Sequence, residues 1–285
     1  AIALAFESIQ IDLSVGGRFQ LAKTLANIGH AYSRLGDVPR AAAYLQRARD
    51  AHERYADKDG RTDTLLVSAE VALDNGALEE AVAWHAEALE ALTRSESAYD
   101  RAHGLVVGAA IAQARGELQK AIELAIEARR MAEKQALVAY HFYAFAIEAS
   151  ARVDAGEVHS ATLLATTALG AVEALQGSEY GLDVRTLCAD ALKRAGSPQA
   201  AATRQRAVDY ATGVMETIRN MRLRKLYSQR SMVAALFDTT PSPLVVARID
   251  PTRGAPFRQT LQSALLPSEL TAMLGARSLP PSEKK

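Results

Sequence analysis

Five glycines recur at a spacing of 40 residues, at Gly36, Gly76, Gly116, Gly156 and Gly196. An internal repeat of this length is typical of a solenoid, in which no unit can bury its apolar face alone and each packs against the next. Small residues flank every glycine: Ala41, Ala81, Ala121, Ala161 and Ala201 stand five residues after it, and Gly29, Ala69, Ala109, Ala149 and Ala189 stand seven residues before it. The spacing therefore predicts that two segments approach closely in every unit.

The segments between the glycines have apolar residues at helical spacing, as at Leu25, Ile28 and Tyr32. Each glycine supplies the left-handed residue that ends the first helix of a unit, and a residue such as Asp37 begins the second. An alanine-rich composition with only 6% aromatic residues favours closely packed helices. The sequence therefore predicts an all-α solenoid of helix-turn-helix repeats.

This pattern resembles the tetratricopeptide repeat (TPR). The first unit carries the resemblance through Leu25, Ile28, Gly29, Tyr32, Gly36, Ala41, Tyr44 and Ala48, and Trp84 takes the place of Tyr44 in the second unit. The 40-residue period exceeds the usual 34. It resembles the longer variant of kinesin light chains and of helical regions in bacterial signalling ATPases, kinases and caspase-like proteins. The resemblance implies a right-handed superhelix over roughly residues 1–212, although Arg152 and Arg185 replace large apolar residues in later units.

The repeat also predicts the domain organisation. Residues 1–17 match the second helix of a truncated repeat, and residues 18–212 form five TPR-like repeats. Residues 213–237 form a capping helix, and residues 238–285 form a Pro-rich tail with short docking helices. Because a solenoid seldom begins on half a unit, we expect the chain to be a fragment of a longer protein; an independent N-terminal cap is the alternative.

Charge and motifs argue against several function classes. Lys+Arg and Asp+Glu both number 33, and we expect no nucleic-acid partner. The basic cluster of Arg219, Arg222, Arg224, Lys225 and Arg230 is interpreted as a solvated helix face, with RNA or DNA binding as the alternative. No apolar run is long enough to span a membrane. A single cysteine, Cys188, fits a cytoplasmic protein.

No constellation for catalysis is found. A phosphate-binding loop is missing, and none of the six histidines has metal-ligand spacing with another histidine or with Cys188. The aromatic run from Tyr140 to Phe145 is interpreted mainly as core, with one or two members facing a ligand. We therefore expect no enzyme, no cofactor and no metal site.

The TPR resemblance implies that the first helix of each unit lines a concave groove. The candidate partner-binding residues are Lys23, His30 and Arg34 in the first unit, Asp63, Glu70 and Asp74 in the second, His103 and Gln113 in the third, Tyr143, Ser150 and Asp154 in the fourth, and Asp183 and Asp190 in the fifth. They do not reproduce the Lys, Asn and Arg clamp with which TPR co-chaperones hold a C-terminal carboxylate.

Acidic residues fill the middle of this predicted groove, and the cations Lys23, Arg34, Lys193 and Arg194 collect at its ends. We expect it to prefer a basic segment, supplied by a partner protein or peptide or, in self-association, by the helix from Arg219 to Arg230 of a second copy. The alternative is that the carboxylates only keep an alanine-rich surface soluble.

Two functions follow from the resemblance. The first is a protein-interaction scaffold or regulatory TPR module, part of a larger bacterial signalling protein, that binds a peptide or helix in its groove. The second is a ligand-sensing helical array that relays to an attached ATPase, kinase or protease domain.

Overall fold

The computed structural model describes residues 18–54, 58–93, 97–174 and 179–237. The predictions for residues 1–17 and 238–285 fall outside these ranges. The described residues form twelve helices and no strand, so the all-α prediction is confirmed. Within them, no helix combines the length and the apolar character needed to cross a bilayer.

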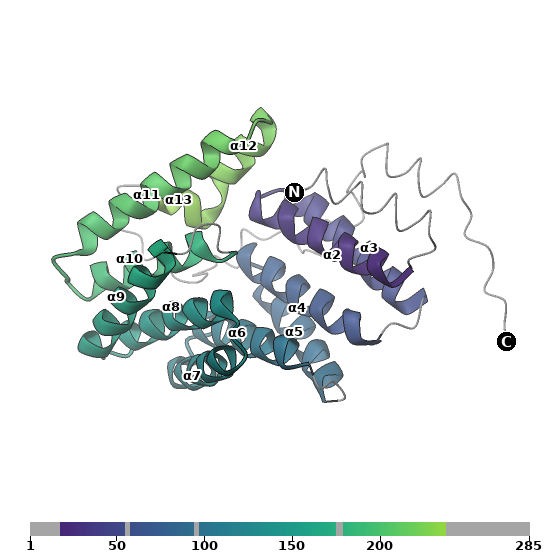
Figure 1. Ribbon diagram of the computed structural model, residues 1–285, viewed down its shortest axis with the longest axis horizontal. Coiled ribbons are helices and arrows are strands. Elements are labelled where there is room, and N and C mark those ends of the chain that lie inside the picture. The colour runs from purple at the N-terminus through teal and green to yellow at the C-terminus, as the bar shows by residue number, and fades with distance from the viewer. Residues whose placement is uncertain (1–17, 55–57, 94–96, 175–178, 238–285) are drawn as a thin grey trace.

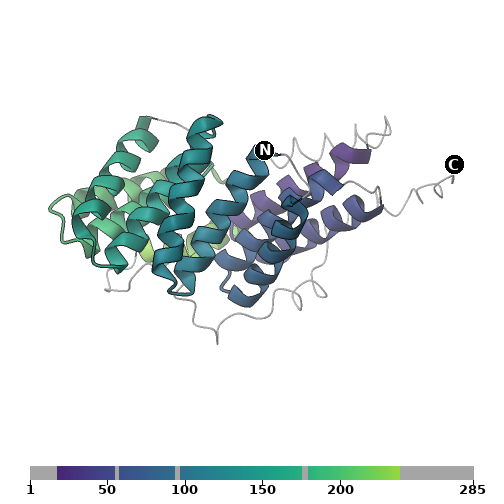
Figure 2. The same cartoon turned by 90° about the horizontal axis from the view of Figure 1, so that it is seen from below.

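Five helical hairpins follow one another along the chain (Figures 1 and 2). They are α2 (Arg18–Arg34) with α3 (Val38–Arg54), α4 (Lys58–Asp74) with α5 (Leu78–Leu92), α6 (Ala98–Ala114) with α7 (Leu118–Lys134), α8 (Val138–Asp154) with α9 (Val158–Ala174), and α10 (Gly181–Arg194) with α11 (Ala200–Thr217). The first helices of successive hairpins, from α2 to α10, also pack against one another in series. This inner layer corresponds to the concave side of a TPR-like solenoid.

The repeated glycines occupy the conformation that the sequence predicts. Gly36, Gly76, Gly116, Gly156 and Gly196 have φ values of 79°, 86°, 75°, 83° and 66°. In the first turn the Gly36 amide donates to the Ser33 carbonyl at 2.8 Å, and the Asp37 amide donates to the Tyr32 carbonyl at 2.9 Å. The same pair of bonds recurs in the other four turns and satisfies the last carbonyls of each first helix.

Small residues lie where the helices of a hairpin approach. Ala41, Ala81, Ala121 and Ala161 are completely buried. Ala201 is exposed, so the predicted register fails in the fifth hairpin. There the turn at Ser197–Gln199 delays α11 by two residues relative to the other second helices, and Thr203, Ala207 and Ala211 become buried instead.

This packing predicts a sharp size limit at Ala121. Replacing Ala121 with Leu adds three carbons at a completely buried position, so we expect a loss of about 1–3 kcal/mol in the free energy of unfolding. The same substitution at the exposed Glu123 of α7 is the control and should be tolerated. Denaturant unfolding of both variants decides it, and equal stabilities would contradict the observed hairpin register.

One turn between hairpins uses a residue that is not glycine. Ala136, between α7 and α8, has φ 54°. The Leu137 amide donates to the Ala132 carbonyl at 2.8 Å, as in the glycine turns. A side chain in this left-handed conformation costs about 1–2 kcal/mol.

We therefore expect Ala136→Gly to raise the free energy of unfolding by about 1 kcal/mol, because relief of the strain exceeds the added freedom of glycine in the unfolded chain. Ala139→Gly, in the first turn of α8, is the control and should be destabilising instead. Thermal melting of the two variants measures the difference, and a lower melting temperature for Ala136→Gly would contradict the expectation.

The residues predicted as one capping helix are divided among three helices. Residues 213–217 continue α11, which Gly213 does not interrupt, and α12 (Met221–Gln229) and α13 (Ser231–Phe237) follow. The break comes at Ile218, whose backbone is extended, and Asn220 caps α12 by accepting from the Leu223 amide at 3.1 Å. This break allows α12 to turn away from α11 toward α2, as Figure 1 shows.

Candidate partner-binding groove

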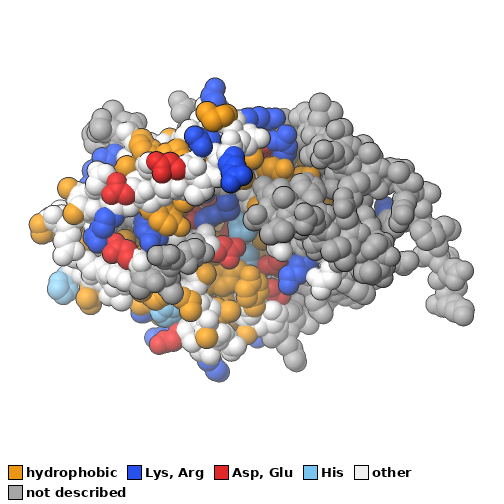
Figure 3. Space-filling view, turned by 45° about the horizontal axis from the view of Figure 1, so that its top comes forward, with side chains coloured by type: hydrophobic (Ala, Val, Ile, Leu, Met, Phe, Trp, Pro, Cys, Tyr) orange, Lys and Arg blue, Asp and Glu red, His pale blue; other side chains and the backbone are white. Residues whose placement is uncertain are grey.

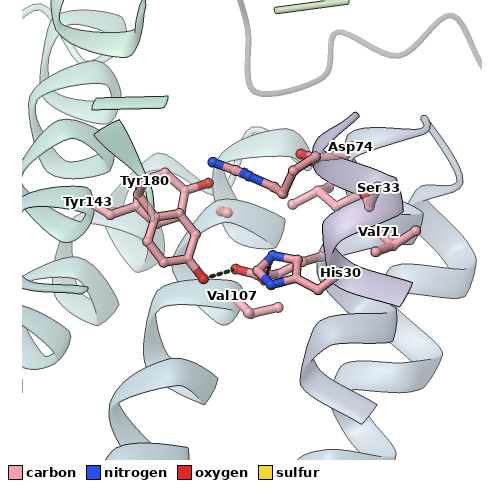
Figure 4. A pocket seen from close by; sticks show the side chains of 11 residues that line it. His30, Ser33, Val71, Asp74, Val107, Tyr143 and Tyr180 are labelled. Carbon is pink, nitrogen blue, oxygen red and sulfur yellow. Dashed lines mark hydrogen bonds and ion pairs between the residues drawn. The ribbon is translucent and has the colours of Figure 1, made fainter. Parts of the chain in front are cut away.

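Polar side chains from the first helices converge around Glu70 of α4. The Tyr180 hydroxyl donates to Oε1 of Glu70 at 2.9 Å (Figure 4). The other carboxylate oxygen lies 3.4 Å from Nε2 of His103 and 3.8 Å from Nε2 of His30. Nδ1 of His103 lies 3.5 Å from Oδ1 of Asp63, so His103 of α6 stands between two carboxylates of α4.

A second set of contacts joins the first hairpin to the fifth. Arg34 of α2 donates to both carboxylate oxygens of Asp183 in α10, one of them at 2.9 Å. It also donates to the Glu179 carbonyl at 2.9 Å, and Nδ1 of His30 lies 3.3 Å from Oε1 of Glu179. Arg34 and Asp183 are 149 positions apart in the sequence. The solenoid therefore closes on itself across its concave side.

Tyrosines from α6, from α8 and from the start of α10 line the same region. The rings of Tyr143 and Tyr180 stack with centroids 4.5 Å apart, and Figure 4 shows them face to face. Tyr140 stacks on His103 at 5.1 Å and donates a hydrogen bond to the Tyr99 hydroxyl at 2.9 Å. Tyr140, Tyr143 and Tyr180 are buried, whereas 45% of Tyr99 is exposed. The tyrosines therefore enclose the polar groups in a largely buried environment.

Burial and neighbouring charges shift the pKa values of the groups that these tyrosines enclose. Burial alone would raise the pKa of Glu70, but His103, His30 and the Tyr180 hydroxyl lower it to about 2. Burial alone would lower the pKa of His103, but Glu70 and Asp63 raise it to about 10. The two groups therefore form a buried ion pair at neutral pH.

Asp74 stands apart from this pair. Desolvation raises its pKa despite the nearby Arg230 and Arg34, although 35% of its side chain is accessible. Among the charged groups of the groove, Asp74 is one of those that a ligand could reach without displacing a buried residue.

The closed groove leaves little free space. Its cavity is lined by His30, Ser33, Arg34, Glu70, Val71, Leu73, Asp74, Val107, Ala110, Tyr143 and Tyr180, and its interior volume is about 10 Å³. That volume accommodates about one water molecule. Figure 3 shows basic, acidic and histidine side chains gathered in a hollow of one face. A polypeptide ligand would therefore have to separate the contacts that close the groove.

The predicted site residues fall into two clusters. His30, Arg34, Asp63, Glu70, Asp74, His103, Tyr143 and Asp183 belong to the closed groove. Gln113, Ser150, Asp154 and Asp190 gather around Arg194, which donates to Ser150 at 2.8 Å and also contacts Asp154 and Asp190. Lys23 is exposed on α2 and belongs to neither cluster.

The expected charge distribution needs correction. The cations do not collect at the ends of an acidic wall: Arg34 reaches across to Asp183, and Arg194 pairs with Asp154 and Asp190. Around the cavity the carboxylates of Asp63, Glu70, Asp74, Glu179 and Asp183 face the cations Arg34, Arg230 and His103. The groove therefore retains an excess of negative charge, smaller than the sequence suggests.

Several residues of the groove were missed from the sequence. Tyr99 and Tyr180 are not among the predicted site residues, and Tyr140 belongs to the aromatic run that was interpreted mainly as core; Tyr140 and Tyr180 are 40 residues apart and so share one repeat position, whereas Tyr99 is one residue out of that register. The sequence predicts a solvated helix face for Arg230, but the structure contradicts this: its side chain is only 8% exposed and lies 3.5 Å from Asp74. Glu179 lies just before α10. Its carbonyl accepts from Arg34 and its carboxylate contacts His30, and both contacts require the first and fifth hairpins to meet.

Comparison with known proteins agrees on the fold. No protein-family profile matches the sequence, and no curated protein matches it either. Among solved structures, a Rap protein complexed with Competence and Sporulation Factor is similar, with 14% sequence identity and a TM-score of 0.53. The similarity covers 87% of this chain and 66% of the Rap chain, so this chain spans less than two thirds of that protein. The likeness and the hairpin array fit a TPR-type fold.

Proposed function

We propose that this chain is a protein-interaction module that receives a basic peptide or helix in its concave groove. The observation that carries the proposal is that polar side chains from α2, α4, α6 and α10 converge in one groove, where carboxylates are in excess. An excess of negative charge attracts a cationic segment, and Asp63, Asp74 and Glu179 are exposed enough to pair with it.

The similar Rap protein supports this proposal, because its structure was determined in complex with Competence and Sporulation Factor. The cavity of about 10 Å³ implies that binding is coupled to opening. Arg34 would exchange Asp183 for solvent while the ligand's cations take over the released carboxylates. Such an exchange replaces one set of ion pairs by another, so the net cost of opening stays moderate.

The direct test is a selection of random peptides that bind the chain. The matched variants are Asp63→Asn/Asp74→Asn/Glu179→Gln, which neutralises accessible groove carboxylates, and Glu90→Gln/Glu127→Gln/Glu133→Gln, which makes the same charge change at exposed positions outside the groove. We expect selected peptides to be rich in Lys and Arg, to lose affinity as salt rises, and to bind the groove variant at least tenfold more weakly, about 1.4 kcal/mol. Equal affinity for both triple variants would contradict the proposal.

A further inference from the structure

Helix α12 connects the two ends of the solenoid. Leu223 packs against the apolar cluster of the first hairpin, which includes Leu25 and Tyr32. One turn later, Tyr227 is only 3% exposed and belongs to a cluster with Leu182 of α10 and Ala207 of α11. A nine-residue helix thus packs one partly buried and one buried side chain against the two ends of the array.

Ion pairs and hydrogen bonds hold α12 at the acidic side of the groove. Arg230, at its C-terminal end, donates to the Arg34 carbonyl at 3.2 Å and to Oδ2 of Asp74 at 3.5 Å. Nη2 of Arg222 lies 4.0 Å from Oδ2 of Asp37. Because the guanidinium of the same Arg34 holds Asp183, docking of α12 and closure of the groove share a residue.

The turn at Gly36 is shaped for this contact. A Cβ atom there would lie 2.6 Å from the Leu226 carbonyl oxygen and 3.0 Å from Cγ of Arg230. At Gly116, which has nearly the same φ, a Cβ atom would meet nothing within 4 Å. Glycine at position 36 is therefore required by the close approach of α12 as well as by the backbone conformation.

We infer that α12 is an intramolecular occupant of the partner's site, and that the partner presents a basic amphipathic helix of the same pattern. That pattern has apolar residues at helical spacing, as at Leu223 and Tyr227, with arginine at both ends, as at Arg222 and Arg230. The inference rests on the proposed function, since it names the class of ligand and the element that competes with it. Few side chains hold α12, so a partner helix can displace it.

The docking of α12 is tested first by hydrogen exchange on the full chain. We expect Gly36→Ala to accelerate exchange of the Met221–Gln229 amides at least about tenfold beyond Gly116→Ala, because both variants strain a turn but only the first meets α12. Equal exchange in the two variants would overturn the docking.

Competition is tested with a labelled synthetic peptide of residues 219–237. Arg222→Gln/Arg230→Gln and, separately, Leu223→Ala weaken the internal helix from its own side. Each should increase the affinity of the full chain for the peptide by about tenfold, since a larger fraction of molecules has an open site. Arg219→Gln/Lys225→Gln is the charge-matched control and should leave the affinity unchanged.

Adding Gly36→Ala to either loosened variant should remove the gain in peptide affinity, because the added methyl group blocks the site for the peptide as well. Adding Gly116→Ala instead should leave the gain in place. Equal affinity of the wild-type and loosened chains, or a gain that survives Gly36→Ala, overturns the inference. The two proposals are distinguishable: if selected basic peptides bind the groove while exchange or competition does not behave as expected, the inference fails and the proposed function stands.

Discussion

Replacing Asp183 with Leu should lower the free energy of unfolding by about 3 kcal/mol. Asp183 is only 1% exposed and accepts two hydrogen bonds from Arg34. Its loss leaves the guanidinium partly buried without a carboxylate and opens the contact between the first and fifth hairpins. Replacing both residues should cost less than the sum of the single changes, because neither charge is then left behind. Denaturant unfolding of the single and double variants measures this coupling.

The control is Glu173→Leu in α9, which removes a carboxylate from an exposed pair. Arg206 and Glu173 retain 53% and 34% of their side-chain exposure, so the expected loss is under about 1 kcal/mol. A comparable loss at Asp183 and Glu173 would mean that the cross-groove pair contributes no more than a surface pair.

The stability of the chain should fall between about pH 6.5 and pH 10 through His103. Its folded pKa is raised from 6.5 to about 10, so its contribution is fully present below pH 6.5 and is lost as the pH rises through the folded value. Glu70 gives the opposite pH dependence on the acid side. Its pKa is lowered from 4.5 to about 2, so its contribution to stability is lost as the pH falls below about 4.5. We expect an alkaline loss of about 5 kcal/mol, because each unit of pKa shift corresponds to about 1.4 kcal/mol.

His103→Gln should reduce the loss of stability at alkaline pH, because the glutamine side chain has no proton to lose in that range. His103 is enclosed by Glu70 and Asp63 of α4, Tyr99 of its own helix and Tyr140 of α8. The control is His159→Gln in α9, where the histidine is exposed and the alkaline loss should persist. Unfolding free energies at about pH 6, 8 and 10 provide the comparison, and an unchanged alkaline loss in His103→Gln would contradict the buried ion pair.

The hairpins were predictable because their causes are local. A left-handed glycine such as Gly76 and a small residue such as Ala81 fix each turn within a few positions, and the glycine recurs in every unit. The fifth hairpin departs because Ser197–Gln199 form an extra turn, which shifts α11 and exposes Ala201. The effect of one added turn on helix register could not be read from the 40-residue spacing alone.

The groove was predictable in its lining but not in its closure. Placing Glu70 or Asp183 on the inner helices needs only the hairpin pattern. Pairing Arg34 with Asp183 depends on the summed rotation of five units, where small differences in each unit decide whether the ends meet. The position of Arg230 depends on the break at Ile218 as well, which has no glycine or proline to announce it.

The central claim, that a basic ligand enters a groove which is closed in the free chain, is tested most directly by measuring the distance across it. Spin labels at Asn27→Cys in α2 and Lys193→Cys in α10 occupy exposed positions on the two sides, with the buried Cys188 replaced by alanine. Double electron–electron resonance should give one compact distance distribution for the free chain and a longer one with a peptide selected for binding. A selected peptide that binds and leaves the distribution unchanged would contradict the account and place the binding surface elsewhere on the solenoid.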